Sequence, residues 1–213
     1  MISQRRYYLD KLYNKDSTEK LKGDVLDIGG KKDNKKGNYR PNSNLKMFFL
    51  NNDLSTNPDF NLDANNFHLE IAKKFDFFFL AEILEHLDNP IQAIKSSNQI
   101  LVKGGIGFIS MPFMYRKHND PKDMQRWTDT KLIEVFKGNG FIVQKIIPMG
   151  GLFCVIYDFW MFSVLHSSKL NPLSILNKII FKIFSPLLRL LELKTRYLEK
   201  SITSGWFLIV KKK

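Results

Sequence analysis

The stretch that most constrains the fold is residues 24–30, which read Asp-Val-Leu-Asp-Ile-Gly-Gly. Apolar residues lead into a carboxylate, Asp27, and then into two glycines, Gly29 and Gly30. This pattern is typical of a buried parallel strand that ends in a tight turn. Glycine has no Cβ, so the backbone can turn sharply there or approach a ligand closely. Ligands of open α/β sheets bind at the carboxyl ends of strands, so we expect a binding site here. An ordinary strand followed by a loop is the alternative.

Apolar runs of strand length recur along the chain and alternate with helical patterns. Besides the strand that ends at Ile28, we predict strands at 45–50, 61–63, 75–80, 106–111, 141–147 and 205–210. One helix is expected to begin at Asn89-Pro90, run through Leu101 and stop at Gly104-Gly105. Another is expected from a cap at Thr128 or Asp129 to Lys137. This alternation predicts an α/β fold with a doubly wound, mostly parallel, seven-stranded sheet.

The remaining segments divide the chain into three parts. Residues 1–22 are expected to form an amphipathic helix that packs on the domain or covers its crevice. The main domain takes residues 23–149 and 204–213, and residues 150–203 form a helical insertion before the last strand. A single cysteine, Cys154, excludes an internal disulfide framework. The start of the chain does not read as a secretory signal, so we expect a cytoplasmic protein.

Three carboxylates fall at the ends of successive predicted strands: Asp27, Asp53 and Asp63. An acid at the end of the second strand is well placed to accept hydrogen bonds from ribose hydroxyls. An acid at the end of the third can accept a hydrogen bond from an adenine amino group. The alternative is that Asp53 and Asp63 cap turns, which aspartate often does.

With these positions in place, residues 20–148 and the last strand resemble the class I S-adenosylmethionine-dependent methyltransferases, in their small-molecule branch. The resemblance is carried by VLDIGG at 25–30, FDFFFLAEILEHLDNP at 75–90 and ILVKGGIGFISMPF at 100–113. It implies a Rossmann-like methyltransferase fold and S-adenosyl-L-methionine as the cofactor. The cofactor-binding residues that it implies are Asp27, Gly29 and Gly30 for the methionine part, Asp53 for the ribose, Asp63 and Ala64 for the adenine, and Glu82 beneath the sulfonium.

The chain departs from this family directly after the first strand. The family continues with a glycine-rich loop into a helix, whereas Lys31 and Lys32 follow Gly30 here. A lysine could hold the cofactor carboxylate or block its approach to the backbone.

The loop at 118–128 resembles a His, Asp, Arg, Thr pattern of related methyltransferases. His118 is the candidate catalytic residue, as a general base. Asp123 could orient His118, or pair with Arg126 to fix the loop. Glu82, Glu85 and His86 are available metal ligands, but the HExxH pattern of zinc sites is missing, so no metal is expected.

The insertion contains two different apolar segments. Residues 152–165 are shorter than the roughly 20 residues of a membrane-spanning helix and contain Asp158. From residue 173 to 198, polar residues recur at helical spacing between aliphatic ones, and we expect a helix break at Ser185-Pro186. The polar strip consists of Lys178, Lys182, Ser185, Arg189, Glu192 and Arg196. A helix of this kind can lie in a membrane interface, so we expect peripheral membrane contact through residues 152–199 at the inner face of the membrane. Covering the sheet edge or forming a homodimer contact are the alternatives.

The predicted function is methylation of a small-molecule, glycan or lipid-linked acceptor, with O-methylation as the first expectation. The net charge is +12, of which residues 150–213 contribute more than half. We do not expect nucleic acid as the partner, because these basic residues lie among aliphatic ones and form no basic-aromatic module. A dehydrogenase is disfavoured because the GxGxxG spacing is missing. The alternative is a catalytically inactive protein of the same fold that binds a membrane or a protein partner through its C-terminal helices.

Overall fold

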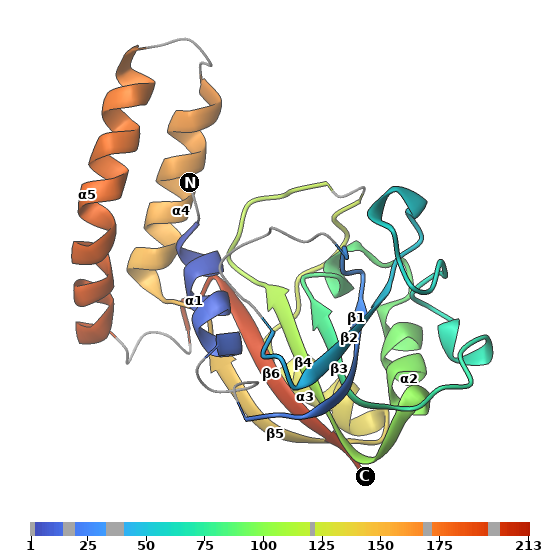
Figure 1. Ribbon diagram of the computed structural model, residues 1–213. Coiled ribbons are helices and arrows are strands. Elements are labelled where there is room, and N and C mark those ends of the chain that lie inside the picture. The colour runs from blue at the N-terminus through green and yellow to red at the C-terminus, as the bar shows by residue number, and fades with distance from the viewer. Residues whose placement is uncertain (1–2, 15–19, 33–40, 120–121, 168–171, 196–200) are drawn as a thin grey trace.

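The computed structural model describes residues 3–14, 20–32, 41–119, 122–167, 172–195 and 201–213. Within them a six-stranded sheet has the order β2-β1-β3-β4-β6-β5 (Figure 1). The strands are β1 (Gly23–Ile28), β2 (Leu45–Leu50), β3 (Phe75–Ala81), β4 (Leu101–Pro112), β5 (Phe141–Pro148) and β6 (Gly205–Lys212). Strands β1 to β4 pair in parallel, and β6 lies antiparallel between β4 and β5.

The α-helices are α1 (Gln4–Leu12), α2 (Pro90–Ile100), α3 (Asp129–Gly138), α4 (Leu152–Ser167) and α5 (Pro172–Lys194). Helix α1 packs on one face of the sheet, and α2 and α3 pack on the other. Side chains alternate between the faces along a strand. On β3, Phe77 and Phe79 join one core cluster with Leu9 of α1, whereas Phe78 and Leu80 join another with α2 and α3. The sheet is therefore doubly wound, as predicted.

Two predicted helix starts are confirmed by their caps. The side chain of Asn89 accepts a hydrogen bond from the Gln92 backbone N–H, and Pro90 occupies the first turn of α2. The side chain of Thr128 accepts from the Lys131 backbone N–H at the start of α3. These bonds satisfy amide groups that have no partner inside the helix.

The predicted end of α2 is wrong by one residue, and the next strand begins sooner than predicted. Leu101 is the first residue of β4, where it pairs with Phe75 of β3. Gly104 and Gly105 lie inside β4 rather than stopping a helix, and the register between β3 and β4 shifts at this point. The pairing of Leu101 with the buried strand β3 therefore outweighs the tendency of Gly104-Gly105 to end a helix.

The predicted strand at 61–63 is not formed, so the described sheet has six strands instead of seven. There, an isolated bridge joins Leu50 to Phe60, and the Phe49 carbonyl accepts from the backbone N–H groups of Asp59 and Phe60. Side chains take the place of a strand: the Asp59 carboxylate accepts from the Phe49 N–H at 2.9 Å, and the Asn61 amide donates to the Asn51 carbonyl at 3.0 Å. The edge of β2 is covered by polar side chains instead of another strand.

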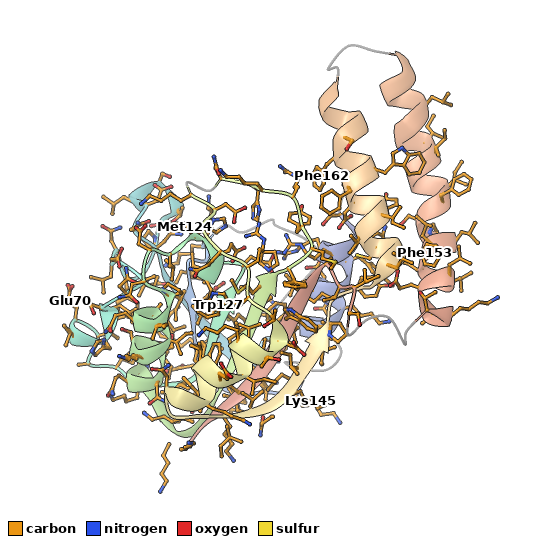
Figure 2. The ribbon with its side chains drawn as sticks, turned by 180° about the vertical axis from the view of Figure 1, so that it is seen from behind. Glu70, Met124, Trp127, Lys145, Phe153 and Phe162 are labelled. Carbon is orange, nitrogen blue, oxygen red and sulfur yellow. The ribbon has the colours of Figure 1, made fainter. Side chains whose placement is uncertain are left out.

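Helices α4 and α5 form a hairpin between β5 and β6 that projects from the sheet (Figure 1). The predicted break at Ser185-Pro186 is wrong, because α5 runs through Pro186. The hairpin contacts the domain through Phe162 of α4, whose ring centroid is 5.7 Å from that of Tyr115 in the loop after β4 (Figure 2). None of the described helices is long and apolar enough to cross a bilayer.

Candidate active site

A cavity of about 620 Å³ opens at the carboxyl ends of β1, β2 and β3. This volume suits a small-molecule ligand. All of the residues implied for cofactor binding line it: Asp27, Gly29, Gly30, Asp53, Asp63, Ala64 and Glu82. Most of them follow the ends of β1, β2 and β3, which meet because parallel strands end at the same edge of the sheet. Asp63 and Ala64 come instead from the connection between β2 and β3.

The turn after β1 needs both of its glycines. Gly29 has a φ of +80°, and a Cβ on it would lie 2.6 Å from Cδ1 of Ile83. A Cβ on Gly30 would collide with the carboxyl group of Asp27. The backbone can therefore fold back over Asp27, which stands at the cavity wall.

Asp27 has an unusual electrostatic environment. Burial raises its pKa to about 7, and the nearby Arg6 guanidinium opposes this change. A carboxyl group with this pKa can be neutral or charged near physiological pH.

Asp53 and Asp63 cap turns and also line the cavity. Asp53 Oδ1 accepts from the Ser55 N–H at 3.0 Å, and the hydrogen bonds from Ser55 lower the pKa of Asp53. Asp63 Oδ1 accepts from the Asn65 N–H at 2.7 Å. Asp53 and Asp63 therefore cap turns, which is the alternative given in the sequence analysis. This role does not exclude ligand binding, because a carboxylate oxygen accepts more than one hydrogen bond.

Glu82 follows β3 in a left-handed backbone conformation, with a φ of +58°. A residue other than glycine rarely adopts this region, and such positions gather at functional sites. The backbone N–H of Glu82 donates to the Ser110 carbonyl at 3.1 Å, and its carboxylate pairs with the Arg5 guanidinium. Glu82 is thus held at the cavity by β4 on one side and by α1 on the other.

The two lysines after Gly30 have different positions. Lys31 lines the cavity. The ammonium group of Lys32 lies 2.5 Å from Asp59 Oδ1, in an ion pair at the edge of β2. Of the two lysines, Lys31 is therefore the one placed to meet a ligand.

The N-terminal segment contributes to the cavity as well as to the core, which the sequence did not specify by residue. Arg6 and Tyr13 line the cavity, and Leu9 packs against the sheet. Arg6 Nε donates to Asp10 Oδ1 at 2.8 Å, which holds the guanidinium in place. Basic and aromatic residues at helical spacing were the sequence signal, but their orientation depends on how α1 docks.

His118 does not line this cavity. It lies in the loop after β4, where its backbone N–H donates to Asp123 Oδ2 at 2.8 Å. Asp123 also accepts from Arg126 Nη2 at 2.6 Å, and this bonding lowers the pKa of Asp123 to about 2. Burial, followed by the positive charge of Arg5, lowers the pKa of His118. Asp123 therefore clasps the loop through Arg126 and also faces His118.

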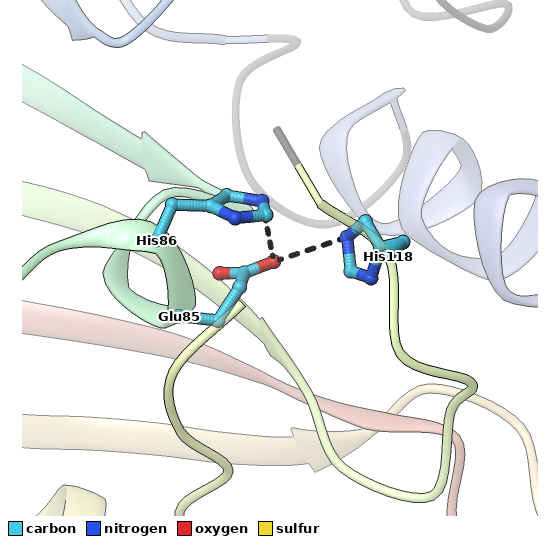
Figure 3. A group of neighbouring side chains, drawn as sticks. All are labelled: Glu85, His86 and His118. Atoms are coloured by element: carbon cyan, nitrogen blue, oxygen red, sulfur yellow. Dashed lines mark ion pairs between the residues drawn. The ribbon is translucent and has the colours of Figure 1, made fainter. Parts of the chain in front are cut away.

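Two neighbouring residues, Glu85 and His86, connect the His118 side chain to the cavity. From the sequence alone they were not grouped with His118. His86 lines the cavity, and the buried Glu85 stands between the two imidazole rings (Figure 3). Glu85 Oε1 lies 3.6 Å from His86 Nε2 and 3.8 Å from His118 Nε2. The backbone of the loop is attached to the same turn, because the Met124 N–H donates to the Glu85 carbonyl at 2.9 Å.

Solved methyltransferase structures share this fold. An S-adenosylmethionine-dependent methyltransferase from Archaeoglobus fulgidus matches with a TM-score of 0.57 and 15% identity, over 97% of this chain and 94% of that one. An O-methyltransferase from Brevibacillus brevis, solved with S-adenosyl-L-homocysteine, matches with a TM-score of 0.57 and 11% identity, over 97% of this chain and 71% of that one. No protein-family model and no curated protein matches the sequence. The chain therefore has the fold of the class I methyltransferases, as the sequence resemblance implied.

The same fold also carries another reaction. The [4+2]-cyclase SpnF matches with a TM-score of 0.54 and 12% identity, over 98% of this chain and 80% of that one. Since one fold can host several reactions, the function must be argued from the residues of the cavity.

Proposed function

We propose that the protein is an S-adenosyl-L-methionine-dependent methyltransferase acting on a small-molecule, glycan or lipid-linked acceptor, by O-methylation. The observation that carries this proposal is the meeting of Asp27, Asp53 and Asp63 in one cavity of a methyltransferase fold. Asp27 precedes Asp53 by 26 residues and Asp53 precedes Asp63 by 10, and a nucleoside ligand accounts for their convergence.

The residues of the cavity fit the cofactor. Gly29 and Gly30 line the cavity beside Asp27, where the methionine part is assigned, and Lys31 or Arg6 can pair with its carboxylate. Asp53 is assigned to the ribose hydroxyls, and Asp63 with Ala64 to the adenine. When bound, the cofactor supplies an activated methyl group. The protein then has to hold an acceptor oxygen in line with that group, which by itself accelerates transfer strongly.

His118 remains the candidate general base for the acceptor hydroxyl. Its lowered pKa leaves the imidazole neutral at pH 7, which a base requires. For this role the acceptor hydroxyl has to extend beyond His86 and meet the His118 imidazole.

A surface on the hairpin supports a lipid-linked acceptor. Helix α5 exposes an apolar stripe at spacings of three and four residues, which places its members on one helix face. The stripe consists of Leu176, Ile179, Ile183, Leu187 and Leu190. On the other side, Ser185 and Glu192 are buried, and the Arg189 guanidinium stacks 3.5 Å from the Tyr7 ring centroid. The polar side of α5 therefore docks inward and the apolar stripe faces outward, which is the orientation that a membrane contact through this helix requires.

Titration with S-adenosyl-L-homocysteine tests the proposed cofactor. We expect the wild-type chain to bind, and Asp53→Ala to bind at least about tenfold more weakly, because hydrogen bonds to a charged group contribute about 1.5–3 kcal/mol. Glu70→Ala is the matched control, since Glu70 is an exposed acid outside the cavity (Figure 2). Absence of binding to the wild type would overturn the proposal. Binding without methyl transfer to any glycan or lipid acceptor would favour the inactive alternative.

A further inference from the structure

Three electron-pair donors converge on one point beside the cavity. The short turn Leu84–His86 contributes Glu85 and His86, and the loop after β4 contributes His118 (Figure 3). Their ligand atoms all lie within 4.8 Å of one another. The imidazole rings are 5.1 Å apart between centroids and nearly perpendicular.

The hydrogen-bond partners of the two histidines fix which nitrogen of each ring carries the proton. Nδ1 of His86 faces the Lys122 carbonyl, and a carbonyl can only accept. Nδ1 of His118 faces two acceptors, the Arg116 carbonyl and Asp123 Oδ2, each at 3.4 Å. These partners assign the proton of each neutral ring to Nδ1, which leaves Nε2, the nitrogen that lies 3.6 or 3.8 Å from Glu85 Oε1, as the electron-pair donor.

Among the described residues no cation is hydrogen-bonded to Glu85, although the charges of Arg5 and Arg126 act on it from nearby. Its side chain is 0% exposed, and among the described residues neither carboxylate oxygen has a hydrogen-bond partner. The guanidinium of Arg5 is engaged elsewhere, paired with Glu82 and stacked 4.0 Å over the ring of Tyr115. A buried carboxylate facing two imidazole lone pairs is unfavourable unless a positive charge lies between them.

We propose that Glu85, His86 and His118 bind one divalent transition-metal ion of the zinc type. Two imidazoles and one carboxylate are a ligand set of catalytic zinc and non-haem iron sites, which keep at least one open position. Nδ1–H groups that donate to a carbonyl or a carboxylate are the usual outer partners of metal-binding histidines.

The ligand atoms have to move closer together to bind the ion. Bonds of about 2.1 Å at tetrahedral angles separate two ligand atoms by about 3.4 Å. The two pairs that include Glu85 Oε1, at 3.6 and 3.8 Å, have to close by a few tenths of an ångström. The two histidine nitrogens, which lie within 4.8 Å of each other, have to approach by up to about 1.4 Å, a movement that side-chain rotation can supply. The loop is already attached: Gln125 Nε2 donates to the Leu84 carbonyl at 3.0 Å and to the Leu87 carbonyl at 3.1 Å. His118 is thereby held against the turn that carries the other two ligands.

The metal ion would also add to the proposed function. This part of the inference rests on the proposed function. Because His86 lines the cavity, a metal ion on its Nε2 would lie at the cavity wall, where it can coordinate and acidify an acceptor hydroxyl. Coordination uses the lone pair of His118 Nε2, so His118 would position the metal instead of acting as a free base.

The test is a titration of untagged, full-length protein, freed of metal with EDTA, first with Zn²⁺ and then with Co²⁺, whose absorption reports its ligands. We expect one equivalent to bind, and Glu85→Gln and His118→Gln each to weaken that binding at least about tenfold. His68→Gln is the matched control, because His68 Nδ1 pairs with Ser96 Oγ at 2.7 Å, outside the cluster. Circular dichroism of each variant establishes that it is folded.

Two results would overturn the proposal: no equivalent bound by the wild type, or equal binding by all three variants. In the first case a proton on Glu85, shared with the histidines, takes the place of the metal. Titration of the same samples with S-adenosyl-L-homocysteine keeps the two proposals apart. A protein that binds the nucleoside but no Zn²⁺ loses only the metal site, and the converse result removes only the methyltransferase assignment.

Discussion

Asp27 is held where its two protonation states have similar free energies near neutral pH. Burial raises its pKa to about 7, whereas the same residue in an unfolded chain titrates near 3.8. Between these values the folded protein binds a proton that the unfolded chain does not. Asp27 therefore makes the free energy of unfolding fall as pH rises from about 4 to about 7, and this contribution levels off above that.

Asp27→Asn should remove this share of the pH dependence. We expect the unfolding free energy of the wild type to fall by about 1–2 kcal/mol more than that of the variant between pH 5 and pH 8, with allowance for water in the cavity. Urea unfolding at the two pH values measures the difference. Other buried acids, such as Asp158 with its pKa raised to about 6, contribute equally to both proteins. Parallel pH profiles would show that Asp27 is not perturbed as proposed.

At the scale of elements, helix α1 connects the hairpin to the cavity. Asp158 of α4 accepts from the backbone N–H of Gln4 at 2.8 Å and of Arg5 at 3.2 Å, which are the first two amides of α1. A carboxylate at a helix N-terminus satisfies these amides and complements the helix dipole. The next residue of α1, Arg6, lines the cavity. The position of the cavity wall therefore depends on the docking of α4.

Asp158→Ala should loosen α1. Two amides lose a buried partner, so we expect a loss of about 1–3 kcal/mol in unfolding free energy. Amide hydrogen exchange over residues 4–12 should become faster, and affinity for S-adenosyl-L-homocysteine should fall. Asp158→Asn is the control, because it keeps one carbonyl acceptor and should lose less. Unchanged exchange over residues 4–12 in Asp158→Ala would contradict this account of the docking.

At the scale of the whole molecule, the sheet domain carries the cavity and the hairpin presents the apolar stripe. Ile183 is 67% exposed and Leu190 61% exposed on the outer side of α5. Contiguous apolar surface of this kind marks a contact with a membrane or with another protein. A membrane-bound hairpin would hold the cavity near lipid-linked acceptors.

Flotation with vesicles of phosphatidylcholine and phosphatidylglycerol tests the membrane contact. We expect the wild type to float with the vesicles, and the double variant Ile183→Asp/Leu190→Asp to float several-fold less, because two charges would enter the apolar layer. Ile142→Asp, at a 51% exposed position on β5, is the matched control. Equal flotation of all three proteins would remove the membrane proposal. Light scattering covers the homodimer alternative: a wild-type dimer that the double variant converts to a monomer would assign the stripe to that contact.

Part of this architecture could be predicted from the sequence because it depends on local chemistry. The strand and turn at 24–30 follow from apolar residues that end in Asp27 and two glycines, and the helix starts at Asn89 and Thr128 follow from their side-chain caps. These features depend on neighbours within a few positions in the chain, so the sequence determines them. Asp27 and Asp53 belong to the same group, because strand polarity places the ends of β1 and β2 at one edge. Asp63 does not, since the strand predicted to end there is not formed.

Other features depended on partners far along the chain. The segment beside β2 forms only an isolated bridge, because the Asp59 side chain accepts from the Phe49 N–H and the Asn61 side chain donates to the Asn51 carbonyl. The polar side of α5 turned inward because α1 supplies its partners, including Tyr7 for Arg189. Likewise, His118 meets Glu85 only because the loop after β4 is attached to the turn at Leu84–His86. The sequence by itself determined the strands, caps and strand-end acids; only the tertiary structure decided which side chains converge, since long-range packing sets those distances.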